Sequence, residues 1–165
     1  MNHTLSLREG YFPGLIADTL TLHIAYYCDK WGFSLPFEAK VARELTYFFE
    51  RYEEGRDLFL SLTTSEGETL ATIAIDGSDA EEKGAHLRWF IVGDAVRGKG
   101  YGGELISQAL SFCREEGYPG VYLTTFKGLD PARHLYEKHG FALREERAVD
   151  QWKGGVVEQL FFLNL

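Results

Sequence analysis

The feature that most constrains this chain is a glycine-rich segment at residues 96–103, with the sequence Val-Arg-Gly-Lys-Gly-Tyr-Gly-Gly. An apolar run at residues 86–92 precedes it and an amphipathic stretch at residues 104–113 follows, which predicts a strand, a tight turn and a helix. Because glycine has no Cβ, backbone N–H groups in such a turn can approach a ligand closely. The unpaired N–H groups of a helix N-terminus add partial positive charge. The segment therefore predicts a phosphate or pyrophosphate site, with the charges of Arg97 and Lys99 beside it.

The length and composition of the chain limit the kinds of protein that it can be. With 165 residues, 45% of them hydrophobic, it suits one domain, residues 1–165, with a substantial core. A net charge of -8 argues against nonspecific binding to nucleic acid or to an anionic membrane. The sequence has no apolar stretch of membrane-spanning length and no secretory start, so we expect a cytoplasmic protein. Cys28 and Cys113 lack a Cys-x-x-Cys partner, which predicts free thiols and no metal site.

Hydrophobic periodicity, with the positions of glycine and proline, predicts the order of helices and strands. We expect strands at residues 4–8, 56–63, 68–75, 86–92, 121–126, 141–149 and 156–163, and helices at residues 15–31, 36–52, 104–113 and 130–139. The polar residues 76–84 are expected to form a loop. Strand-to-helix units in the second half, with hairpins elsewhere, predict an α/β (mixed α+β) domain whose mixed sheet carries helices on both faces.

Two common phosphate-binding patterns can be compared with the glycine-rich segment. A P-loop requires Ser or Thr after Gly-Lys, and Gly100 stands there instead, which excludes a P-loop. The spacing Gly98-x-Gly100-x-x-Gly103 does match the dinucleotide fingerprint of oxidoreductases. That fingerprint also needs an acidic residue at the end of the next strand, where this chain has Lys127. The segment also comes too late in the chain for a doubly wound fold, so two features stand against this alternative.

A second motif follows the strand predicted at residues 121–126. Residues 97–102, Arg-Gly-Lys-Gly-Tyr-Gly, match Arg/Gln-x-x-Gly-x-Gly/Ala, and residues 132–141, Ala-Arg-His-Leu-Tyr-Glu-Lys-His-Gly-Phe, match Ala-x-x-Leu-Tyr-x-x-x-Gly-Phe. With both motifs and the predicted element order, the chain resembles the GNAT superfamily of acyl-CoA-dependent N-acetyltransferases over essentially its whole length. Residues 123–136 and 157–159 are similar to acetyltransferase domains fused to winged-helix MarR-type regulators, and we expect no DNA-binding part here. The resemblance implies a mixed, mostly antiparallel sheet of six to seven strands flanked by about four helices.

The resemblance also implies which residues bind acetyl-CoA. Backbone amides of residues 97–103 are expected to hold its diphosphate, and backbone groups of residues 90–92 to pair with the pantetheine arm. The expected cofactor-binding residues are Phe90, Ile91, Val92, Arg97, Gly98, Lys99, Gly100, Tyr101, Gly102, Gly103 and Thr125. Many relatives carry asparagine where this chain has Leu129, so that contact to CoA is not expected here.

The family's catalytic tyrosine corresponds to Tyr136 in this resemblance. After direct attack of an amine through a tetrahedral intermediate, a phenol beside the sulfur can act as general acid when CoA leaves as a thiolate. The alternative interpretation of Tyr136 is an aromatic side chain on the packed face of a short helix, beside Leu135. No general base is indicated, because residues 86–92 include no acid. The nearest acidic residues fit surface charges: Glu66, Glu68, Asp94, Asp150 and Glu158.

The expected acceptor is a small-molecule or peptide amine, bound between the first pair of helices and the last hairpin. The candidate wall residues are Tyr26, Tyr27, Trp31, Phe33, Arg88 and Trp152. A CoA-binding sensor or regulatory module with weak catalysis remains an alternative function, as does the oxidoreductase. The apolar residues 160–163 suit either a homodimer contact or the last strand of the sheet.

Overall fold

A seven-stranded sheet organises the computed structural model, which describes residues 4–148 and 150–165. The strands are β1 (Leu5–Glu9), β2 (Leu58–Thr64), β3 (Thr69–Asp76), β4 (Ala85–Val92), β5 (Gly120–Phe126), β6 (Ala142–Arg147) and β7 (Glu158–Asn164). The helices are α1 (Leu15–Trp31), α2 (Leu35–Glu50), α3 (Ala80–Lys83), α4 (Tyr101–Glu115) and α5 (Asp130–Lys138). The strand order is β1-β2-β3-β4-β5-β7-β6, and only β4 and β5 pair in parallel. The predicted mixed, mostly antiparallel sheet is confirmed.

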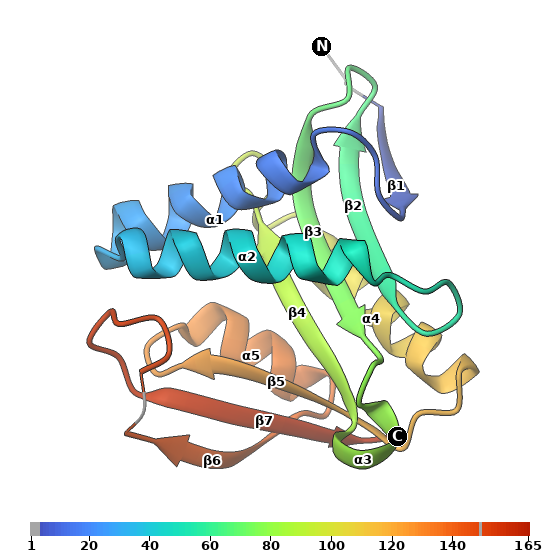
Figure 1. Ribbon diagram of the computed structural model, residues 1–165, viewed down its shortest axis with the longest axis vertical. Helices are drawn as coiled ribbons and strands as arrows, with labels where there is room; N and C mark the ends of the chain where they lie inside the picture. The colour runs from blue at the N-terminus through green and yellow to red at the C-terminus, as the bar shows by residue number, and fades with distance from the viewer. Residues whose placement is uncertain (1–3, 149) are drawn as a thin grey trace.

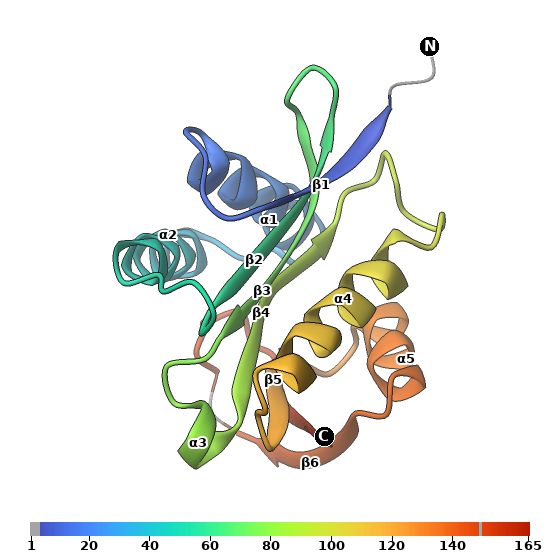
Figure 2. The same ribbon diagram turned by 90° about the vertical axis from the view of Figure 1, so that its right-hand side faces the viewer.

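Helices cover both faces of the sheet, as predicted. Figure 2 shows α1 and α2 on one face and α4 and α5 on the other. Helix α2 packs on the sheet because Phe37, Val41, Leu45 and Phe48 recur at helical spacing and are all buried. No helix among residues 4–148 and 150–165 is both long and apolar enough to cross a bilayer.

Some predicted boundaries were wrong, each for a local reason. Residues 76–84 include α3, a helix of four residues, too short to leave a periodic pattern in the sequence. Strand β7 begins at Glu158 rather than at residue 156, because the Asp150 carboxylate accepts hydrogen bonds from the N–H groups of Gly155 and Val156 and holds them in a turn. Strand β6 ends at Arg147; residue 149, where the prediction ended, lies outside the described residues.

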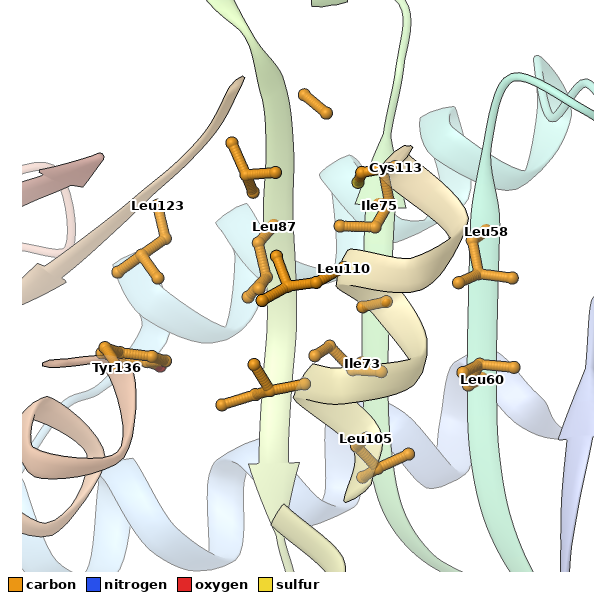
Figure 3. Packing of buried hydrophobic residues seen from close by; sticks show 14 of the residues in the cluster. Leu58, Leu60, Ile73, Ile75, Leu87, Leu105, Leu110, Cys113, Leu123 and Tyr136 are labelled. Atoms are coloured by element: carbon orange, nitrogen blue, oxygen red, sulfur yellow. The ribbon is translucent and has the colours of Figure 1, made fainter. Parts of the chain in front are cut away.

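Two apolar cores lie on the two faces of the sheet. In the first core, Cys113 of α4 lies by Ile75 of β3, and Leu110 of α4 lies beside Leu87 of β4 (Figure 3). The second core joins α1 and α2 to the other face and is rich in aromatic rings, such as Phe37, Phe48, Phe59 and Trp89. Burial of one such side chain contributes roughly 1.5–3 kcal/mol, so the two cores hold the sheet rigidly between the helices.

The parallel neighbours β4 and β5 separate soon after they begin. Their paired residues are Ala85 with Val121 and His86 with Tyr122, and beyond these the two strands diverge (Figure 1). Strand β4 also carries one extra residue relative to β3, and Trp89 takes a φ of 45° there. The divergence and the bulge together open the sheet in the second half of β4.

Candidate active site

A cavity of about 450 Å³ lies beside the second half of β4, where the sheet opens. The glycine-rich segment and α5 form its other walls, and the end of α1 borders it. Its lining residues are Tyr26, Tyr27, Lys30, Phe90, Ile91, Val92, Val96, Arg97, Gly98, Gly100, Gly102, Gly103, Leu129, Pro131, Ala132, Leu135 and Tyr136. Eight of the eleven predicted cofactor-binding residues are therefore brought together around one cavity.

Glycine is required at three positions of the segment for two different reasons. Gly98 and Gly100 have φ values of 76° and 88°, a conformation that is strained for residues with a side chain. Gly102 has no such constraint, but an added Cβ would lie 3.1 Å from Leu135 Cδ2 and 3.3 Å from Phe90 Cζ. The close approach of α4 to α5 and β4 therefore depends on the missing side chain at position 102.

Helix α4 begins at Tyr101, three residues before the predicted start. Gly100 provides the left-handed cap, and the N–H of Glu104 is the first to bond back along the helix, to the Gly100 carbonyl oxygen at 3.2 Å. The N–H groups of residues 101–103 therefore have no acceptor within the helix. They lie at the positive end of a 15-residue helix, where Gly102 and Gly103 line the larger cavity, and suit a phosphate oxygen.

Arg97 lies at the larger cavity but already has protein partners. Its guanidinium forms a short ion pair with Asp94 and donates to the Val92 carbonyl oxygen at 2.9 Å. It also lies 5.3 Å from the centre of the Tyr26 ring, and Lys30 approaches the same Asp94 at 3.5 Å. The predicted charge is thus in place, and Asp94 partly neutralises it.

Three predicted cofactor-binding residues do not line the larger cavity. Lys99 is exposed on the turn, and the Tyr101 ring packs against the core beneath α4. Thr125 lines the second, smaller cavity instead, because it lies on β5 beyond the point where β5 leaves β4. Their predicted contacts with the cofactor, through backbone amides for Lys99 and Tyr101, stay predictions.

The prediction also missed lining residues of the larger cavity. Lys30 comes from α1 and reaches the cavity only through tertiary packing, so no local signal marks it. Tyr26, also on α1, was predicted as an acceptor wall and lines this cavity instead. Ala132 and Leu135 belong to the second motif, which could have indicated their place on the cavity side of α5. Leu129 stands where many relatives carry asparagine, and it lines the cavity with an apolar side chain.

A second cavity, of about 120 Å³, lies against α1, α2 and the loop between β6 and β7. Its lining residues are His23, Tyr27, Phe37, Lys40, Val41, Glu44, His86, Leu87, Arg88, Trp89, Phe90, Leu123, Thr124, Thr125, Phe126, Tyr136, Gln151 and Trp152. Of the predicted acceptor walls, Tyr27, Arg88 and Trp152 line it. Trp31 and Phe33 do not line it; both rings pack against Phe126.

Tyr136 lies where the two cavities meet. Tyr27, Phe90 and Tyr136 line both cavities, and the Tyr136 residue is only 6% exposed. Its ring packs between Phe90, Phe141 and Phe161, with centroids 5.9–6.2 Å away. Burial, and then the nearby Tyr27, raise the pKa of Tyr136 far above that of a free phenol. The hydroxyl therefore keeps its proton at any physiological pH, as a proton donor must.

Proton acceptors at the smaller cavity are few. Glu44 is its lining carboxylate, and both of its oxygens are engaged by Lys40 and Arg88. The Nδ1 of His23 donates to the Thr19 carbonyl oxygen at 2.7 Å, which leaves a lone pair on Nε2. Burial lowers the pKa of His23 to about 4, so the ring is neutral at pH 7.

The acidic residues noted in the sequence add no proton acceptor to either cavity. Within the described part of the chain, none of them lines either cavity: Glu66, Glu68, Asp94, Asp150 and Glu158. Among the same described residues, no group of three or more His, Cys, Asp or Glu side chains is placed to hold a metal ion.

The fold closely matches several solved acetyltransferase structures. A GNAT-family acetyltransferase from Staphylococcus aureus has a TM-score of 0.79 at 16% identity, covering 98% of this chain and 99% of that one. An acetyltransferase from Streptococcus agalactiae has a TM-score of 0.76 at 18% identity, covering 98% of each chain. A spermidine N-acetyltransferase from Vibrio cholerae has a TM-score of 0.67 at 16% identity, covering 96% of this chain and 94% of that one. No curated protein sequence matches this chain.

The family assignment comes from the amino-acid sequence. The family model described as Acetyltransferase (GNAT) family matches residues 22–141, which include the second half of α1, the glycine-rich segment and Tyr136. This match decides against the P-loop and dinucleotide interpretations of the glycine-rich segment. The chain belongs to the GNAT family of acetyltransferases.

Proposed function

We propose that this chain transfers the acetyl group of acetyl-CoA to a primary amine. The observation that carries the proposal is the junction of two cavities at Tyr136, one beside the N-terminus of α4 and one beside α2. A group-transfer enzyme needs two sites that meet at a proton donor, and this arrangement supplies them.

The residues around the larger cavity suit CoA. The free N–H groups of residues 101–103 and the side chains of Arg97 and Lys30 match the charge of a diphosphate. The rest of the wall is mainly apolar and includes Phe90, Val92 and Leu135, which suits an extended pantetheine arm. When bound, acetyl-CoA supplies a thioester with an electrophilic carbonyl carbon.

The chain's own groups have distinct tasks in this proposal. Tyr136 Oη holds a proton that it can donate to a leaving thiolate. His23 Nε2 offers a lone pair to an amine N–H in the smaller cavity. The rings of Tyr27 and Phe90 exclude water from the junction, which strengthens both hydrogen bonds.

A coupled assay tests this proposal. The protein is incubated with acetyl-CoA and a broad panel of primary amines, and CoA release is followed with a thiol reagent and product by mass spectrometry. We expect amine-dependent CoA release and an N-acetylated product. Release that does not depend on any amine, or no release, would contradict the proposed transfer.

A second candidate is a CoA-binding sensor or regulatory module with weak catalysis. One observation favours it. Two cations engage the carboxylate of Glu44 at the smaller cavity, so this carboxylate is not free to accept a proton from an amine. Acetyl-CoA binding in calorimetry, without turnover of any amine in the panel, would support this candidate over the enzyme.

A further inference from the structure

The smaller cavity differs in charge from the chain as a whole. The chain carries a net charge of -8, but the ionised side chains at this cavity are Lys40 and Arg88, both positive, and Glu44. The two histidines do not add charge: burial lowers the pKa of His23 to about 4, and burial with the nearby Arg88 lowers that of His86 to about 3. Cations therefore outnumber anions where the acceptor binds.

The two cations also retain unused hydrogen-bond donors. Lys40 Nζ donates to Glu44 Oε1 and Arg88 NH2 donates to Glu44 Oε2, each at 2.5 Å. A lysine has three N–H donors and an arginine has five, so each cation keeps donors after bonding Glu44. Both oxygens of Glu44, the carboxylate among the lining residues of this cavity, are already engaged by these two cations.

Arg88 is held in place before any ligand arrives. Its side chain is 17% exposed, lies 4.2 Å above the centre of the Trp89 ring, and has an ion pair at 3.5 Å with the buried Asp76. A fixed guanidinium suits the planar, two-oxygen geometry of a carboxylate. Lys40, one helical turn before Glu44 on α2, adds a second positive charge on the same wall.

We propose that the amine acceptor is a single amino acid, whose carboxylate binds Lys40 and Arg88 while its amine faces the junction at Tyr136. This inference rests on the proposed acetyl transfer and names its acceptor class. The cavity volume of about 120 Å³ and the rings of Phe37, Phe126 and Trp152 suit one small side chain. A polyamine offers further cations and no anion, so it leaves the spare donors of Lys40 and Arg88 without a partner.

Matched acceptor pairs test the proposal. Each free amino acid of a panel is compared with its decarboxylated amine, for example alanine with ethylamine, at saturating acetyl-CoA. We expect at least one amino acid to have a kcat/KM at least about tenfold above that of its amine, because a charge-assisted hydrogen bond contributes that much.

Three variants show whether the two cations cause this preference. Lys40→Met and Arg88→Met should reduce it at least about fivefold, mainly through KM for the amino acid. Arg43→Met removes the same charge from an exposed position of α2 outside both cavities, and should keep the preference. Circular dichroism melting checks that each variant folds. If Arg88→Met unfolds, Lys40→Met still tests the proposal, because the Lys40 side chain is only partly buried.

The outcomes separate this inference from the proposed function. Three results would each overturn the inference alone: amines preferred over their amino acids, a preference unchanged in Lys40→Met, or no amino acid accepted by a protein that acetylates other amines. Absence of acetyl-CoA binding would overturn the proposed function and, with it, this inference.

Discussion

The ring centroids of Phe90 and Tyr136 lie 5.9 Å apart, at the place where the two cavities meet. Phe90 comes from the bulged part of β4 and Tyr136 from α5, on the far side of the opening between β4 and β5. The opening of the sheet, the proton donor and the two candidate binding sites therefore converge on one pair of rings.

Tyr136→Phe should lower kcat for acetyl transfer about 100-fold, because it removes the general acid and leaves the ring packing in place. The Kd for acetyl-CoA should stay within about twofold, since the lost hydroxyl makes no hydrogen bond to another described residue. Tyr11→Phe is the control, because Tyr11 is exposed and lines neither cavity. Steady-state kinetics and calorimetry check this; an unchanged kcat in Tyr136→Phe would refute the acid role.

Asp94→Asn should tighten acetyl-CoA binding about threefold, because it removes an anion that pairs with Arg97 and Lys30 beside the larger cavity. The gain should shrink as salt is added, since both partners are exposed. Glu115→Gln, at the other end of α4, removes the same charge and should leave the Kd unchanged. Equal effects of the two variants would show that Arg97 and Lys30 have no specific role in binding.

Acid should destabilise the fold through His23. Burial lowers its folded pKa from 6.5 to about 4, so the unfolded chain binds more protons as pH falls through this range. The corresponding stability is complete above pH 6.5, and about 2 kcal/mol of it is lost between pH 7 and pH 5. Urea unfolding of His23→Gln should show a smaller loss over that interval. The exposed His134→Gln is the control, and equal slopes in both variants would exclude His23 as the cause.

Asp76→Asn should lower the free energy of unfolding by about 3 kcal/mol, because it leaves Arg51 and Arg88 without their shared carboxylate. Burial alone would raise the pKa of Asp76, but hydrogen bonds from Arg51 and Ser78 outweigh it and hold the pKa well below its usual value. The pair therefore stabilises the fold above about pH 4 and is lost below it. Glu137→Gln breaks the exposed pair with Arg133 and should change stability by less than about 0.5 kcal/mol. Denaturant titration distinguishes the two; a similar small effect of both variants would contradict this account.

Local signals in the sequence explain which parts of the fold were predictable. The glycine-rich segment, the alternation in β4 and the proline at position 131 each act on neighbouring residues, so their effects can be expected without tertiary structure. The second motif, at residues 132–141, indicated Tyr136 as the catalytic candidate.

The remaining features depend on contacts between distant segments. Tyr26 and Lys30 reach the larger cavity because α1 crosses the opening near β4, and Arg88 meets Glu44 because α2 packs over the sheet. The bulge at Trp89 needs the register with β3, where the Thr72 hydroxyl donates to the Trp89 carbonyl oxygen at 2.7 Å. No pattern within one segment contains this information.

Calorimetric titration with acetyl-CoA tests the central claim most directly, with the wild type, Gly100→Trp and Gly117→Trp. Both glycines have positive φ and lie at opposite ends of α4, so both variants carry the same backbone conflict, but Gly100 alone of the two lines the larger cavity. The account predicts roughly micromolar binding by the wild type and Gly117→Trp, and none by Gly100→Trp. Failure of the wild type to bind acetyl-CoA, or equal binding by Gly100→Trp, would contradict it.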